Sequence, residues 1–365
     1  SSGNENGMML VDVLDETVTP MGARLLKRWI MLPLKDKHAI NERLQAVSYF
    51  IEASDLASSL AGQLKQVGDL ERLISKVALG KVSPRDVLQL SRSLDITQSL
   101  RTVLGSSPNS SLKTVADQLN PCQLIKERID RELDPEAPAM LNKGGVIRPG
   151  VDSSLDELRN IARNGKEVLL NIQQREAEHT GITSLKVGFN NVFGYYIEVT
   201  NTHKDKVPAE WTRKQTLTNA ERYITAELKE YEEKILGAEE KIAAIEERLF
   251  NELAVTLLEY IQPVQLNAAL LARLDVLLSF ANVASQFDYC LPEINESLVL
   301  DISNGRHPVI ERKLPAGEKF IANDMLLDPD DRQILMITGP NMSGKSALLR
   351  QTALITLMAQ IGSYV

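Results

Sequence analysis

Apolar side chains recur every three to four residues along most of the chain, a spacing that predicts amphipathic helices. Residues 10–133 follow this pattern throughout and indicate an all-helical scaffold, in which Pro33 and Gly80 are helix stops. The predicted helices at its start cover residues 23–30, 36–56 and 57–79. A strongly apolar helical stretch at residues 252–287 is predicted to return through this scaffold as a buried helix.

Two further helical stretches carry matching apolar seams and flank a segment of different period. The seam residues are Leu155, Leu158, Ala162, Gly165, Leu169 and Ile172, then Leu228, Tyr231, Ile235, Ala238, Ile242, Ile245 and Leu249. Between the seams, residues 185–190 and 192–200 are rich in β-branched and aromatic side chains, which predicts strands. Asn190-Asn191 is a candidate hairpin turn between them. The sequence therefore predicts an antiparallel two-helix arm with a small β-rich tip.

Charge is distributed unevenly along this predicted arm. Basic residues lie at or near the tip, namely Lys186, Lys204, Lys206, Arg213, Lys214 and Arg222, and they are diluted by Glu198, Asp205, Glu210 and Glu221. The returning helix is acidic, and neutral donors at the tip include Asn190, Asn191, Gln215, Thr216 and Asn219. A mildly basic tip of this kind suits contact with a phosphate backbone. On the charge pattern alone, an ordinary solvated hairpin is the alternative.

The composition is that of a soluble globular protein of two or three domains: 365 residues, 43% hydrophobic and 25% charged. A formal net charge of -8 means that a nucleic-acid partner needs a local basic surface. Cys122 and Cys290 lack metal-ligand spacing, which favours two free thiols in a reducing compartment. We find no signal-peptide pattern and expect no membrane span. Trp29 and His38 are predicted to be packing residues.

The clearest chemical motif lies near the end of the chain. Residues 333–338 form a short apolar run that predicts a buried strand, residues 339–346 fit G-x-x-x-x-G-K-[ST], and residues 347–360 have helical spacing. Strand, glycine loop and helix are the order in which a phosphate-binding loop is built. In such a loop Lys345 reaches the β- and γ-phosphates and Ser346 places a hydroxyl on Mg²⁺.

The motif and its surroundings resemble the MutS DNA mismatch-repair ATPases. The resemblance rests on residues 338–346 with 349–353 and 361–363, and on further stretches in the family's order across essentially the whole chain. These stretches are residues 19–29, 185–190 with 192–198, 215–223, 305–311 and 320–323.

The resemblance implies a mainly α fold with four parts. They are a helical core and lever domain at 1–150, a long antiparallel helical arm with a β-rich clamp at 151–235, returning lever helices at 236–288, and the truncated start of an α/β, ABC-like P-loop ATPase domain at 289–365. The clamp of this family grips the DNA backbone without reading sequence.

The resemblance also implies ligands and partners. The nucleotide-binding positions are Gly339, Pro340, Asn341, Met342, Ser343, Gly344, Lys345, Ser346, Ala347 and Phe320, with Phe320 stacking on adenine. ATP or ADP is the implied nucleotide, with Mg²⁺ on Ser346. For DNA the resemblance carries over the clamp region, with Asn219 and Arg222 as its preferred positions; Asn190, Asn191, Lys214 and Gln215 are further candidate DNA-binding residues at the tip. Implied partners are mismatched double-stranded DNA, a second copy in a homodimer and a MutL-type protein, in the bacterial cytosol and without a membrane.

The sequence also departs from the family. The family's mismatch-reading domain with its Phe-x-Glu motif has no counterpart in it. The Walker B acid and the signature loop have none either, so we expect negligible ATP hydrolysis by this chain. Ser343 and Ala347 replace the family's more frequent glycine and threonine, and we expect little effect because both are small. Two alternatives stay open: a DNA-junction factor of the same superfamily that does not recognise mismatches, and a generic P-loop protein with a structural coiled-coil arm.

Overall fold

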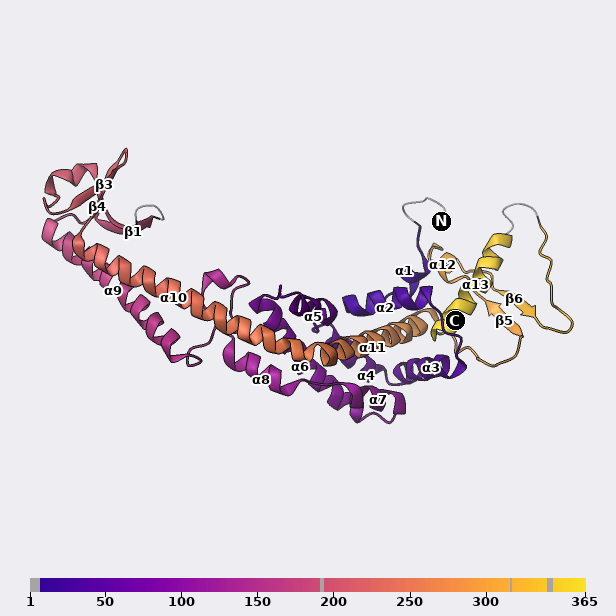
Figure 1. The fold of residues 1–365 in the computed structure, drawn as a ribbon. Helices are drawn as coiled ribbons and strands as arrows, with labels where there is room; N and C mark the ends of the chain where they lie inside the picture. Colours follow the sequence, from indigo (N-terminus) through magenta and orange to yellow (C-terminus); the bar gives the residue numbers. More distant parts are fainter. Residues whose placement is uncertain (1–6, 191–193, 316, 340–343) are drawn as a thin grey trace. The chain divides into compact units, whose positions relative to one another are not determined.

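The computed structural model describes residues 7–190, 194–315, 317–339 and 344–365, coloured along the chain in Figure 1. Its contacts divide into two compact units, one of residues 1–81, 89–126 and 258–365, the other of residues 82–88 and 127–257. Helices dominate, and the strands form two small antiparallel sheets, which confirms the predicted mainly α fold class. The domain boundaries drawn at 150, 235 and 288 stay predictions.

The first unit is built around helix α11 (Ile261–Phe287), which packs against α2, α3 and α5. Its shorter helices are α1 (Leu10–Leu14), α2 (Pro20–Met31), α3 (Lys37–Glu52), α4 (Ser54–Leu64), α5 (Leu70–Ala78) and α7 (Ser110–Gln118). Helices α6 (Pro84–Gly105) and α8 (Gln123–Glu132) contribute residues to both units. Sixteen residues of α11 are buried, as expected of a helix that is apolar on all sides.

Three of the predicted helices have wrong bounds. The segments expected at 36–56 and 57–79 form three helices, because Ala53 leaves the helical conformation (φ -100°, ψ 55°) and α4 already ends at Leu64. Asp69 then caps α5 by accepting a hydrogen bond from the Arg72 N–H at 3.3 Å. The expected helix at 252–287 is likewise interrupted by the short 3-10 turn η3 (Leu258–Tyr260). Apolar spacing continues through these breaks, so periodicity does not reveal them.

The predictions for single residues of the scaffold are partly confirmed. Trp29 is buried, as predicted, but His38 is 86% exposed and its Nε2 lies 3.4 Å from Glu42, so its prediction as a packing residue is wrong. His38 falls in the first turn of α3 on the side that faces solvent. Cys122 and Cys290 are both free thiols, as predicted, and burial raises the pKa of Cys122 to about 11.

One helical stretch, Ala226–Phe287, is long and apolar enough by composition to cross a membrane, although we expected none. Its most apolar window is 78% buried inside the structure. Burial of this extent is the pattern of a core helix, and we draw no membrane span from it.

The second unit contains the predicted arm. Helices α9 (Ser153–Thr180) and α10 (Ala226–Leu257) lie side by side (Figure 1). Leu155, Leu169 and Ile235 of the predicted seams are buried between them. At Gly165 the helices approach so closely that an added Cβ would lie 2.5 Å from Cγ1 of Ile235. The two-helix arm is therefore confirmed.

The segment that connects α8 to α9 packs against α10 and is held there by hydrogen bonds to a buried glutamate. It contains the 3-10 turn η1 (Leu141–Lys143) and three glycines with positive φ, Gly144, Gly145 and Gly150. Glu246 of α10 is fully buried and accepts hydrogen bonds from the N–H groups of Gly145 (3.1 Å) and Val146 (3.3 Å) and from Arg159 of α9 (2.5 Å). One carboxylate thus joins the connector to both arm helices.

The tip is an antiparallel four-stranded sheet of order β1-β2-β4-β3. Its strands are β1 (Lys186–Asn190), β2 (Gly194–Thr200), β3 (Thr212–Thr216) and β4 (Ala220–Ile224), with the 3-10 turn η2 (Asn201–Lys206) after β2. The predicted β-rich tip is confirmed, but β3 and β4 were not identified as strands. The sequence of β3, Thr-Arg-Lys-Gln-Thr, is wholly polar because β3 is an edge strand.

The last part of the first unit holds a two-stranded sheet of β5 (Leu300–Gly305) and β6 (Asn323–Leu327), the short helix α12 (Pro308–Glu311) and helix α13 (Lys345–Ile361). The predicted strand at residues 333–338 is wrong: the segment is irregular, and Ile334 and Met336 are 85% and 84% exposed. A strand needs a hydrogen-bonded neighbour, and no described strand pairs with this segment.

Candidate nucleic-acid and nucleotide sites

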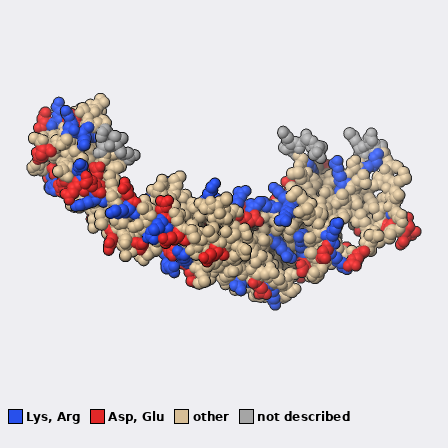
Figure 2. Space-filling model, in the orientation of Figure 1, with Lys and Arg blue, Asp and Glu red and all other residues tan. Residues whose placement is uncertain are grey.

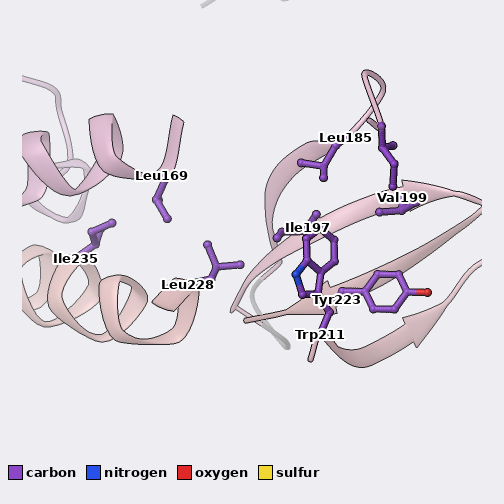
Figure 3. Close-up of a cluster of buried hydrophobic side chains, with 9 residues drawn as sticks. Leu169, Leu185, Ile197, Val199, Trp211, Tyr223, Leu228 and Ile235 are labelled. Atoms are coloured by element: carbon purple, nitrogen blue, oxygen red, sulfur yellow. The ribbon is translucent and has the colours of Figure 1, made fainter. Parts of the chain in front are cut away.

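The inner face of the four-stranded sheet packs on the ends of the two arm helices. Ile197, Val199 and Tyr223 lie on this face with Trp211 from the loop before β3. The same cluster contains Leu169 of α9, Ile182, Leu185, and Leu228 and Ile235 of α10 (Figure 3). Because side chains alternate along a strand, residues between these positions belong to the outer face. The inner face therefore attaches the sheet to the arm helices, and the outer face is available for contacts with a ligand.

Two side chains from different helices hold the β1–β2 hairpin in place. Gln173 of α9 accepts a hydrogen bond from the Val187 N–H of β1 (2.9 Å), and Glu232 of α10 accepts one from the Tyr195 N–H of β2 (3.1 Å). Tyr195 lies beyond the residues of β2 that pair with β4, and Glu232 provides an acceptor at this end of the strand. Gly194 has φ 76° and carries no side chain to collide with Glu232.

The register places four polar residues in one row across the outer face. Lys186 of β1 lies opposite Glu198 of β2, Glu198 lies opposite Arg222 of β4, and Arg222 lies opposite Gln215 of β3. Two predicted DNA-binding residues, Gln215 and Arg222, therefore lie side by side. Sequence reasoning did not assign Glu198 a role beyond diluting the positive charge.

The other predicted DNA-binding residues lie along the rim of the sheet. Lys214 is the exposed extra residue of a bulge in β3, and Asn219 is exposed in the turn between β3 and β4. That turn is fixed by Asn201, whose backbone N–H and side-chain amide donate to the carbonyls of Asn219 (3.1 Å) and Thr218 (3.0 Å). Asn190 ends β1, and Asn191 lies outside the described residues.

The charges at the sheet differ in how strongly they are paired. Lys186, Lys206 and Lys214 are exposed and have no ion-pair partner among the described residues, whereas Arg213 lies 3.3 Å from Glu221. Burial and the hydrogen bond to Glu221 raise the pKa of Tyr223 to about 12, so its hydroxyl stays a donor. Figure 2 shows Lys and Arg side chains over the sheet with Asp and Glu side chains beside them, and further Asp and Glu side chains where the sheet meets α9 and α10.

The helix half of the predicted phosphate-binding loop is present. Gly344 adopts φ 85° and precedes Lys345, the first residue of α13, so Ser346 and Ala347 lie in the first turn, where helix N–H groups have no intrahelical partner. Lys345 donates a hydrogen bond from Nζ to the Gly339 carbonyl. Pro340, Asn341, Met342 and Ser343 lie outside the described residues. These features fit a phosphate group, whereas the strand half of the motif is not formed.

The other predicted nucleotide contact, Phe320, has no described interaction with the start of α13. The ring of Phe320 packs against His307 at 6.5 Å between centroids, and no described interaction joins it to the loop. Among the described residues no group of three or more histidine, cysteine, aspartate or glutamate side chains could hold a metal ion. A P-loop Mg²⁺ needs no such group, because phosphate oxygens and a Ser/Thr hydroxyl provide ligands.

Comparisons with known proteins match almost the whole chain. Residues 1–281 match the family model described as MutS domain III, and residues 335–365 match MutS domain V. The "DNA mismatch repair protein MutS" of Phocaeicola vulgatus is 58% identical over 364 residues, which is 100% of this chain. The proteins of the same name from Parabacteroides distasonis and Bacteroides fragilis are 59% and 58% identical over 99% and 100% of it. The chain spans 42% of the length of each of these three relatives.

Proposed function

This chain belongs to the MutS family, and from that premise we propose that it supplies the lever, the DNA-backbone clamp and the first ATPase segment of a DNA mismatch repair protein. The observation that carries the proposal is the four-stranded sheet mounted on α9 and α10, with exposed lysines at its rim. Lysines of this kind contact phosphates and position a protein without reading bases.

In this proposal DNA lies against the rim and outer face of the sheet. Lys214, Asn219 and Asn190 provide donors toward the backbone, together with Gln215 and Arg222 in the row described above. The assembly is a homodimer in the bacterial cytosol that closes two such sheets around mismatched DNA and recruits a MutL-type partner.

The nucleotide part of the proposal concerns the start of α13. The N–H groups of its first turn and Lys345 hold the phosphates of ATP or ADP, Ser346 provides a hydroxyl to Mg²⁺, and Phe320 stacks on adenine. The bound nucleotide supplies the free energy of hydrolysis, which the longer protein couples to its grip on DNA.

Binding of fluorescent duplexes by the 365-residue chain tests the clamp. We expect weak binding that falls with salt, with equal affinity for matched and mismatched duplexes. Replacing Lys206 and Lys214 by alanine reduces the slope of log K against log salt by about 0.9 for each phosphate that these lysines neutralise. Lys241→Ala, an exposed lysine on α10, is the matched control and leaves the slope unchanged.

Two outcomes contradict this proposal. One is binding of equal strength at low and high salt. The other is a loss of affinity in Lys241→Ala as large as that in the double variant at the sheet.

A further inference from the structure

The outer face of the four-stranded sheet holds an arginine whose orientation is fixed from several sides. Arg222 donates from Nε to Oε2 of Glu198 (3.0 Å) and from Nη1 to Oε1 of Gln215 (2.9 Å). Its guanidinium carbon lies 4.1 Å from the centre of the Tyr196 ring. That ring in turn lies over Gly188, where a Cβ would be 2.9 Å from it. The guanidinium is therefore held flat on the face of the sheet.

This arginine keeps donors available for a ligand. A guanidinium has five N–H donors, and the two bonds to Glu198 and Gln215 use two of them. The other three have no partner among the described residues, although the side chain is only 18% exposed. A planar fork with free donors matches the oxygens of a phosphodiester.

The same arginine has a carboxylate beside it. Glu198 is 33% exposed, lies next to Arg222 on one side and faces Lys186 on the other, so the row reads positive, negative, positive. A phosphate that approaches the free side of Arg222 meets the negative charge of Glu198 at short range. Glu198 therefore weakens the electrostatic attraction that Lys186 and Arg222 exert on a phosphate.

We infer that Glu198 attenuates phosphate binding by Arg222, so that the sheet holds the DNA backbone weakly and releases it readily. This inference rests on the proposed function of the sheet as a DNA-backbone clamp. Glu198 does not touch the DNA; it acts through Arg222, which it orients and at the same time partly neutralises. A clamp that travels along a duplex benefits from contacts that exchange quickly between phosphates.

The variant Glu198→Gln separates the two effects of this side chain. The amide keeps the shape and an oxygen that accepts the Arg222 Nε–H, but it removes the negative charge. We expect the 365-residue chain with this change to bind a 30-base-pair duplex about fivefold more tightly at 0.15 M salt, with a salt slope steeper by about 0.9.

Two further variants are the controls. Glu210→Gln removes an exposed charge in the loop before β3, outside the row, and changes affinity less than twofold. In a background of Arg222→Ala, Glu198→Gln also changes affinity less than twofold, because the arginine that it would release is gone.

Each result has one meaning. Tighter binding and a steeper slope that depend on Arg222 support the attenuator. Unchanged or weaker binding by Glu198→Gln, with salt-dependent binding by the unmodified chain, overturns it and leaves the clamp proposal standing. Absence of salt-dependent binding by the unmodified chain overturns the clamp proposal itself, and the attenuator with it.

Discussion

A single buried carboxylate organises the start of the helical scaffold. Asp275 of α11 is 2% exposed and accepts hydrogen bonds from the Val18 N–H (2.9 Å), the Thr19 N–H (2.8 Å) and the Thr19 hydroxyl (2.6 Å). Thr19 in turn caps α2 by accepting from the Gly22 N–H (2.9 Å). The sequence analysis did not identify Asp275. The feature that could have indicated its role is an acidic residue standing alone in an apolar helix.

Asp275→Ala is expected to destabilise the chain by about 3 kcal/mol or more, because it leaves two backbone donors and a hydroxyl buried without an acceptor. Urea unfolding followed by circular dichroism measures the loss. Asn282→Ala, an exposed position on the same helix, is the control, and a loss of similar size there contradicts the assigned role of Asp275.

His307 makes stability depend on pH. Its Nδ1 accepts hydrogen bonds from the N–H groups of Val309 (3.3 Å) and Ile310 (3.2 Å), and only the deprotonated nitrogen can do so. Burial, aided by the charge of Arg350, lowers the pKa of His307 below its ordinary value of 6.5. As pH falls through 6.5 the unfolded chain therefore gains a proton that the folded chain resists, and stability decreases.

We expect the urea midpoint to be lower at pH 5.5 than at pH 7.5, and this difference to shrink in His307→Asn, which keeps a capping oxygen but does not titrate. An equally large pH dependence in that variant assigns the effect to other groups.

At the scale of elements, the arm depends on one close helix approach. A Cβ at Gly165 would lie 2.5 Å from Ile235, whereas a Cβ at Gly237 of α10 meets nothing within 4 Å. Gly165→Ala is therefore expected to destabilise the chain by about 1–3 kcal/mol through overpacking. Gly237→Ala is expected to stabilise it by up to about 1 kcal/mol through helix propensity.

Thermal or urea unfolding distinguishes these two glycines. In a double-mutant cycle, Gly165→Ala and Ile235→Ala together should cost less than the sum of their separate losses, since Ile235→Ala removes the side chain with which the added Cβ collides. If the two single variants change stability in the same direction, the close approach does not control the arm.

The elements also show which features periodicity can predict. The change of apolar period from seven-residue seams to alternation predicts the arm and its β tip, because each period corresponds to one backbone geometry. The strand β3 escapes prediction because an edge strand needs no apolar face. The hydrogen bonds from strand N–H groups to Gln173 and Glu232 cannot be predicted either, since they join residues that are distant in sequence and leave no periodic pattern.

At the scale of the whole molecule, the phosphate-loop motif and the structure give different information. The motif identifies residues 339–346, but the burial of residues 333–338 depends on neighbouring strands that local sequence does not specify. In the described chain the Lys345 ammonium bonds to Gly339, and Ile334 and Met336 are exposed.

We therefore expect ATP turnover by the 365-residue chain, with or without DNA, to be no higher than that of its Lys345→Ala variant. Phosphate release measures this directly. A rate comparable to that of an intact P-loop ATPase, abolished by Lys345→Ala, contradicts the expectation.

The two ties of the β1–β2 hairpin have a mechanical consequence. Gln173 and Glu232 belong to different helices and hold different strands of one hydrogen-bonded ladder. Sliding α9 along α10 by a single residue, about 1.5 Å, must break a tie or shear the ladder. The hairpin therefore resists axial slippage of the arm helices.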